Sequence, residues 1–134
     1  MLDYYIGVLI IISVIPTMIK PIKRKLLPNT VTYQKYLGDT GTGDSYDTIA
    51  TLKFVALQRK KVIRTTASGI ITVSNATLFI DAYNSTLDGE PITNDMLAIK
   101  SKIIFDNTNY VIIDFETFDY ELDKGIHHWE VTLL

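Results

Sequence analysis

Hydrophobic and polar positions alternate most clearly in the last third of the chain. Three segments there, residues 100–106, 110–120 and 127–134, switch between apolar and polar side chains in the manner of strands, and turn residues separate them. The four polar residues from Asp106 to Asn109 predict a hairpin with a four-residue loop. Asp123, Lys124 and Gly125 predict the next turn. The end of the chain is therefore expected to form antiparallel sheet.

Upstream, the pattern predicts further strands. Residues 30–37 are rich in β-branched and aromatic side chains and form the first predicted strand. Residues 51–63 fit both a helical and a strand spacing, and their β-branched content favours a strand. Short strands are also expected at residues 70–73 and 77–82, with Ser74 and Asn75 between them.

Two stretches rich in turn-forming residues predict long loops at residues 38–47 and 83–95. Asp88 and Gly89 give the strongest turn signal of the second stretch. Pro21 and Pro28 bracket a basic segment, where a helix is not expected because proline lacks a backbone donor.

These elements predict an all-β fold: a small β-barrel or a sandwich, with about six short strands and long loops. A chain of 134 residues suits one domain with a single core, and the predicted domain comprises residues 18–134. The pattern does not determine which strands pair.

Residues 1–17 form an apolar N-terminal extension, predicted to be a short helix. A helix from Tyr4 to Ile15 would be about 18 Å long, against a hydrocarbon core of about 30 Å, so it is too short to span a bilayer. Asp3 stands where a signal peptide carries basic residues. The alternatives are a helix packed on the domain or on a neighbouring subunit, a membrane tether, and translation from Met18.

Composition excludes little and favours no particular partner. The chain is 47% hydrophobic and 21% charged with a formal net charge of -2, which argues neither for disorder nor for a generally basic nucleic-acid-binding surface. It contains no cysteine, so disulfides, thiolate catalysis and sulfur-ligated zinc are excluded.

No pattern predicts an enzyme, a cofactor or a metal site. The only histidine pair, His127 and His128, is adjacent on a strand, so the two rings should point to opposite faces. One ring is expected to pack against Tyr120 or a neighbouring strand, and the other to lie at the edge. Asp39, Asp44 and Asp47 lack the ligand spacing of a calcium loop, and a solvated loop explains them as well. The chain has neither a Gly-x-Ser-x-Gly elbow nor a Walker loop.

Charge gathers in two places. Arg59, Lys60, Lys61 and Arg64 form the densest basic cluster, expected to be a solvated strand end or hairpin tip, with contact to nucleic-acid phosphates as the functional alternative. The acidic counterpart comprises Asp114, Glu116, Asp119, Glu121 and Asp123, which are expected to face solvent or a basic partner.

Several segments resemble the small minor capsid proteins encoded among the neck genes of tailed phages and prophages of Gram-positive bacteria, which serve as head-closure or stopper proteins. The resemblance covers residues 19–134, without the apolar start. Its most specific part is the ending His-His-Trp-Glu-Val-Thr-Leu at 127–133. The other matching segments lie at 21–33 (Pro-Ile to Leu-Leu-Pro-Asn-Thr-Val-Thr-Tyr), 53–58, 76–81, 101–106 and 110–112.

This resemblance implies a β-barrel subunit of the virion that assembles in the host bacterial cytoplasm. Copies would form a ring of six or twelve below the portal and its adaptor, close the DNA channel after packaging and present a lower face to the tail. The implied partners are other copies of the chain, the portal or adaptor protein, a tail-terminator or tail-to-head joining protein, and packaged DNA contacted without sequence preference. No small-molecule substrate is implied.

One long loop is expected to gate the channel. The first candidate is residues 58–69, with Gln58, Arg59, Lys60, Lys61, Arg64, Ser68 and Gly69, and the second is residues 38–47, with Asp39, Gly41, Gly43 and Asp44. The alternative function is a small oligonucleotide-binding or SH3-like barrel that binds a ligand or nucleic acid, tethered to a membrane by its N-terminus.

Overall fold

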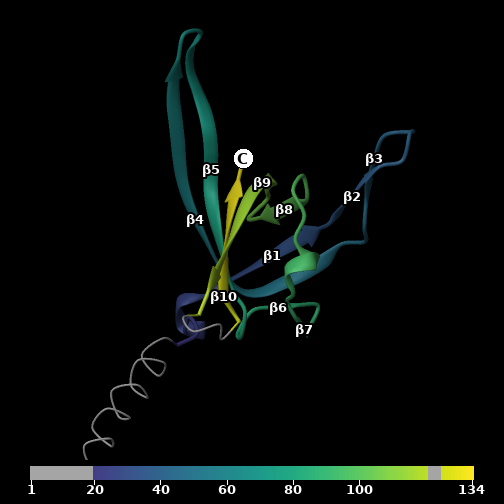
Figure 1. Cartoon of the computed structure of the whole chain (residues 1–134), viewed down its shortest axis with the longest axis vertical. Helices are drawn as coiled ribbons and strands as arrows, with labels where there is room; N and C mark the ends of the chain where they lie inside the picture. The colour runs from purple at the N-terminus through teal and green to yellow at the C-terminus, as the bar shows by residue number, and fades with distance from the viewer. Residues whose placement is uncertain (1–19, 121–124) are drawn as a thin grey trace, which may run out of the picture.

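The computed structural model describes residues 20–120 and 125–134, which are built mostly of strands (Figure 1). A short 3-10 turn, η1 (Arg24–Leu26), precedes the first strand, and a second, η2 (Asn94–Met96), lies between β7 and β8. The strands are β1 (Asn29–Gln34), β2 (Tyr36–Asp39), β3 (Asp44–Tyr46), β4 (Ala50–Thr66), β5 (Gly69–Asp81), β6 (Thr86–Leu87), β7 (Glu90–Pro91), β8 (Lys102–Phe105), β9 (Thr108–Asp119) and β10 (Ile126–Leu133).

Six of these strands close into a ring. The main sheet has the order β1-β8-β9-β10-β5-β4-β6-β7, and an additional pairing of β1 with β4 joins the two ends of the six-stranded part. Neighbouring strands are antiparallel throughout. The predicted all-β fold with a small barrel is confirmed.

The core fills the inside of this ring because alternate residues of each strand point inward. Val31 of β1, Leu52 and Val55 of β4, and Val131 of β10 are at most 2% exposed. Trp129 is 1% exposed, and its indole N–H donates to Asn94 Oδ1 at 3.0 Å, which ties η2 to the ring. The other inward residues include Tyr33, Leu78, Ile80, Ile103, Ile112 and Leu133.

Strand lengths correct the sequence-based expectation of short strands. β4, β5 and β9 have 17, 13 and 12 residues. The two short strands predicted at 70–73 and 77–82 are one strand, because Ser74 pairs with Val62 and Ala76 with Arg59, so β4 supports the chain between them. The strand predicted at 30–37 is interrupted at Lys35, between β1 and β2. Residues 51–63 lie within β4, which confirms the strand interpretation.

Turn lengths also differ from the prediction. The four-residue loop predicted at Asp106–Asn109 is wrong: Phe105 pairs with Thr108, and only Asp106 and Asn107 form the turn. Both have positive φ (52° and 61°), which Asp and Asn tolerate and which two-residue hairpins require. The turn signal at Asp88 and Gly89 is confirmed, since Leu87 pairs with Glu90 across it.

The N-terminal extension, residues 1–17, lies outside the described residues, as do Asp123 and Lys124 of the predicted turn. The division at residue 18 therefore stays a prediction.

Candidate functional site

A long hairpin rises from the ring and is the most prominent feature of the surface (Figure 1). β4 pairs with β1 only as far as Val55, and β5 pairs with β10 only from Ala76 onward. Beyond the pair Arg59–Ala76, the described strands β4 and β5 pair only with each other. We call residues 60–75 the arm. The turn at its tip consists of Ala67 and Ser68, because Thr66 pairs with Gly69.

The first predicted gating loop is therefore wrong as a loop and lies mainly in strands. Gln58 and Arg59 are at the base of the arm, and Lys60, Lys61 and Arg64 follow along β4. Ser68 and Gly69 are at the tip, where the Thr66 hydroxyl donates to the Gly69 carbonyl at 2.9 Å. Gly69 has φ +124°, a backbone conformation that other residues rarely adopt.

Arg59 differs from the rest of the basic cluster because its side chain contacts the ring. Its Nε donates to the Tyr110 hydroxyl at 3.2 Å, and its guanidinium lies 3.4 Å from the Asp106 carboxylate and 5.2 Å from the Phe105 ring centroid. The hydrogen bond to Tyr110, with Asp106 nearby, raises the pKa of Arg59. Arg59 thus fixes the base of the arm against the β8–β9 turn. Lys60, Lys61 and Arg64 are exposed and carry no ion pair among the described residues.

Four aliphatic side chains of the arm are exposed: Val62 (43%), Ile63 (55%), Ile70 (68%) and Ile71 (44%). Thr65 pairs with Ile70, and Arg64 pairs with Ile71, so residues 63, 65, 70 and 72 share one face and residues 62, 64 and 71 the other. Both faces of the arm therefore present β-branched aliphatic residues to solvent. Two-stranded hairpins are at best marginally stable in water, and such a surface is typical of a contact with another molecule.

The register of the arm shifts twice, between Arg59 and Val62 and between Val62 and Ile63. The first shift places Lys60 and Lys61 opposite a single residue of β5, as in a β-bulge. Bulges bend a strand and increase its twist, so β4 is expected to bend where the arm leaves the ring.

The second predicted gating loop is a small hairpin. Asp39 of β2 pairs with Asp44 of β3, and the positive φ angles of Gly41 (+91°) and Gly43 (+124°) allow the turn between them. The hydroxyl of Tyr36 donates to Asp44 at 2.9 Å, and this hydrogen bond raises the pKa of Tyr36. The loop prediction is corrected here too, although the hairpin also projects from the ring (Figure 1).

The three aspartates of this region each bind backbone or hydroxyl donors close to them. Asp39 accepts from the Gly41 N–H and Asp47 from the Thr48 N–H. Among residues 20–120 and 125–134, no group of three His, Asp or Glu side chains is placed to hold a metal ion.

The predicted acidic row lies on the outer face of the ring. Asp114, Glu116 and Asp119 of β9 are exposed, while Glu121 and Asp123 lie outside the described residues. Glu116 pairs directly with Glu130 of β10. Like charges at directly opposite positions repel each other, so this face should favour a cationic partner.

The histidine pair departs from the predicted geometry. A register shift between Ile126 and His128 brings the two rings together, with 2.7 Å between the two Nδ1 atoms, so they do not point to opposite faces. The prediction that one ring packs against Tyr120 is confirmed for His127, in an edge-on arrangement at 4.8 Å. His128 stacks on Phe118 and contacts Glu130 at 2.9 Å.

Asp81 is an important polar residue that the sequence analysis missed. It is fully buried, and its carboxylate accepts from the backbone N–H groups of Ile22 (2.8 Å), Tyr83 (3.0 Å) and Asn84 (2.7 Å). The Asn84 side chain in turn donates to the Ile22 carbonyl at 2.7 Å. Asp81 followed by Asn84 and Ser85 is a side-chain-to-backbone turn signal, but its contact with residue 22 has no local signal.

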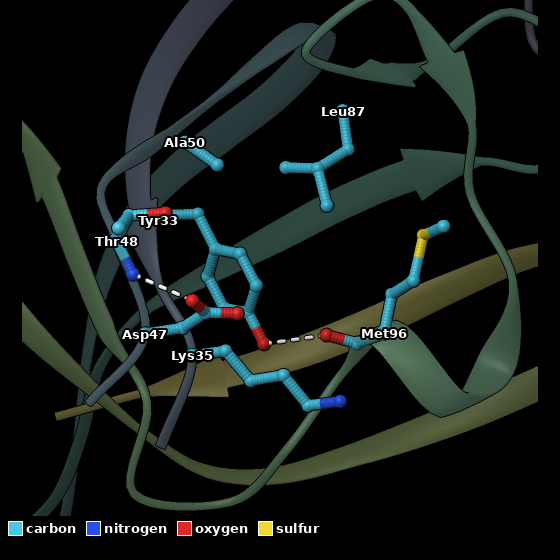
Figure 2. A pocket seen from close by; sticks show the side chains of 7 residues that line it. All are labelled: Tyr33, Lys35, Asp47, Thr48, Ala50, Leu87 and Met96. Carbon is cyan, nitrogen blue, oxygen red and sulfur yellow. Dashed lines mark hydrogen bonds between the residues drawn. The ribbon is translucent and has the colours of Figure 1, made fainter. Parts of the chain in front are cut away.

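One pocket of the described structure has a volume of about 170 Å³. It is lined by Tyr33, Lys35, Asp47, Thr48, Ala50, Leu87 and Met96 (Figure 2). The Tyr33 hydroxyl donates to the Met96 carbonyl at 2.7 Å and is therefore occupied by the fold, and burial raises its pKa. Ligand pockets usually have about 300–1,000 Å³, so this pocket does not suggest a substrate site.

None of the helical segments in the described part of the chain has the length and hydropathy needed to cross a bilayer.

The model of a family described as "Minor capsid protein" matches residues 21–133, which include the whole ring and both projecting hairpins. No curated protein matches the chain.

Proposed function

This chain belongs to the minor capsid protein family, and from that premise we propose that it is the head-closure protein of a phage neck. Because the family is one of minor capsid proteins, the chain is a structural phage protein and a component of the virion. In the proposed role, copies form a ring of six or twelve subunits below the portal and its adaptor. The ring closes the DNA channel after packaging and provides the surface to which the tail attaches.

The arm is the observation that carries this proposal. A closed ring of strands supplies a rigid body, and residues 60–75 extend from it with both faces exposed. A gate needs an element that can reach into a channel without disturbing the fold of the subunit. The arm meets this requirement because its strands pair only with each other beyond Arg59 and Ala76 among the described residues.

A structural role also agrees with the chemistry of the surface. The carboxylates of Asp39, Asp44 and Asp81 bind backbone or hydroxyl groups, and one side of the small pocket is formed by Tyr33, whose hydroxyl is hydrogen-bonded within the fold. We propose no catalytic activity and no cofactor. DNA in the channel would be contacted without sequence preference, through Lys60, Lys61 and Arg64.

A matched pair of hairpin deletions tests the gate. Arg59 and Ala76 are directly opposite, so residues 60–75 can be replaced by an Asn-Gly turn without changing the ring. Asp39 and Asp44 are also opposite, so residues 40–43 can be replaced in the same way to shorten the second candidate. Phage carrying the arm deletion should package DNA and then lose it, whereas the other deletion should retain DNA.

Filled and stable heads from the arm deletion would exclude the arm as the gate. Leakage from the shortened β2–β3 hairpin alone would assign the gate to that hairpin. A neck reconstruction without density for this chain would contradict the proposed location altogether.

The alternative, a monomeric nucleic-acid-binding barrel, predicts a different result. A filter-binding titration of the isolated chain would then show an affinity for DNA that falls steeply with salt. The head-closure proposal predicts weak binding by the monomer, because the arm has only three cations and no aromatic side chain lies among them.

A further inference from the structure

We propose that the arm of one copy docks on the outer face of β9 and β10 of the next copy. This inference rests on the proposed ring, for which it specifies the contact between subunits. In this contact only the strands of the arm touch the neighbour. The tip of the arm, residues 66–69, extends past the neighbour toward the channel.

The need for a protein partner follows from the apolar part of the arm. Val62, Ile63, Ile70 and Ile71 are exposed on two faces, within a hairpin that has no other strand beside it in the described structure. DNA phosphates would bind the lysines and Arg64 but would leave these four side chains in water. A protein surface can cover both kinds of side chain at once.

The outer face of β9 and β10 has the complementary charge. Asp114 and Glu116 are exposed on β9, and Glu130 lies directly opposite Glu116 on β10. The facing carboxylates repel each other, and a cation placed between them would relieve that repulsion. The arm supplies Lys60, Lys61 and Arg64, which have no acidic partner among the described residues of their own chain.

The same face also offers apolar surface at one end. Val111 and Leu134, each 41% exposed, exchange two backbone hydrogen bonds of 3.0 and 2.9 Å, so their side chains lie next to each other. A groove of about 280 Å³ opens beside Val111 and is lined in part by Ile104. Lys102 also lines this groove, but its ammonium group lies 4.2 Å from the Tyr46 ring centroid. The groove can accept an aliphatic side chain of the arm.

The arm and the outer face of β9 agree in length and in the order of their side chains. Arg59 to Thr66 and Val111 to Phe118 contain equal numbers of residues, so at about 3.3 Å per residue each segment is about 23 Å long. Ile63 and Ile70 share one face of the arm, and Lys61 lies on the same face by alternation along β4. If the tip of the arm points toward Val111 and this face is turned to the neighbour, Ile70 meets the groove and Lys61 meets Glu116. An arm that contacts a different surface of the next copy makes a heterologous interface, and such interfaces close into rings when the rotation allows.

Charge reversal on each side, followed by mixing, tests this contact. One variant carries Lys61→Glu on the arm, and the other carries Glu116→Lys on the face. Sedimentation velocity of the full chain at low salt should show self-association of the unaltered protein. Each variant alone should associate at least about tenfold more weakly, because like charges then meet across the interface.

An equimolar mixture of the two variants should associate again. In the mixture, the unaltered arm meets the unaltered face, and the reversed arm meets the reversed face. Restoration by mixing cannot arise from misfolding of either variant, and circular dichroism of each variant provides the additional control. A cysteine pair offers a second measurement: the natural chain has no cysteine, so Ile70→Cys and Val111→Cys should crosslink between copies under oxidation.

Outcomes that overturn the inference are distinct from those that overturn the proposed function. Two results would show that the arm docks elsewhere: an unaltered chain that does not associate together with a cysteine variant that does not crosslink, or charge-reversed variants that fail to associate when mixed. Loss of DNA binding by the arm variant with unchanged self-association would assign the cations to DNA. The proposed function would survive each of these results as long as the arm deletion still causes DNA loss.

Discussion

Replacing Asp81 by asparagine should destabilise the ring more than any change to an exposed acid. The Asp81 carboxylate accepts three backbone N–H groups, one from residue 22 and two from the turn that follows β5. Asparagine keeps the shape but has only one acceptor oxygen. If that oxygen serves Tyr83 and Asn84, its NH₂ group faces the Ile22 N–H, and two donors meet.

The expected loss of stability follows from the hydrogen bond that is lost at position 81. A hydrogen bond to a charged group contributes about 1.5–3 kcal/mol, and a buried donor left without an acceptor costs about 1–3 kcal/mol. We therefore expect Asp81→Asn to lower the free energy of unfolding by about 3 kcal/mol. For a domain of this size, each kcal/mol corresponds to about 4 °C, so the midpoint of thermal unfolding should fall by about 12 °C. A domain with about 5–15 kcal/mol of stability remains folded at room temperature.

Urea unfolding followed by tryptophan fluorescence measures this change. Trp129 is the only tryptophan and is 1% exposed, so its emission reports on the core of the ring. The urea midpoint should fall while the slope of free energy against urea stays the same. Asp119→Asn, an exposed acid of β9, is the matched control and should change stability by less than about 0.5 kcal/mol. Equal midpoints for the two variants would refute the role given to Asp81.

Two further predictions concern Tyr33 and Gly69. Tyr33→Phe removes a hydroxyl that contacts the Met96 carbonyl and Ser101 Oγ, and should cost about 1 kcal/mol near neutral pH. Burial raises the pKa of Tyr33 above its ordinary value of 10.0, so the folded state holds the phenol proton more tightly than the unfolded state does. The contribution of Tyr33 to the free energy of unfolding is therefore present below pH 10 and is lost as the pH rises above 10. Tyr33→Phe should therefore reduce the fall in urea midpoint above pH 10, whereas Tyr83→Phe, at an exposed tyrosine, should not. Gly69→Ala should strain the tip of the arm, because the φ of Gly69 is +124°. Limited proteolysis should therefore cut the arm faster, while unfolding monitored by Trp129 fluorescence stays unchanged. A large shift in the unfolding midpoint would mean that the arm is coupled to the ring.

The sequence alone determined the fold class and the position of one turn. Alternation with a period of two identified the strands of the last third and the strand character of residues 51–63, because side chains on a strand point to opposite faces in turn. Asp88 and Gly89 identified a turn by their backbone preferences. Such rules depend on near neighbours in the chain, so they can be applied without knowing the fold.

Only the tertiary structure decided where strands end and which residues meet. Residues 64–66 follow the predicted strand at 51–63 and lie outside that prediction. They extend the strand because β4 and β5 continue to pair beyond the ring. The contact between Asp81 and Ile22 joins positions 59 residues apart, and the pairing of Glu116 with Glu130 depends on the register of β9 and β10. Hydrogen bonds between distant segments form only when the whole ring closes. Local sequence patterns therefore cannot predict which of these segments meet.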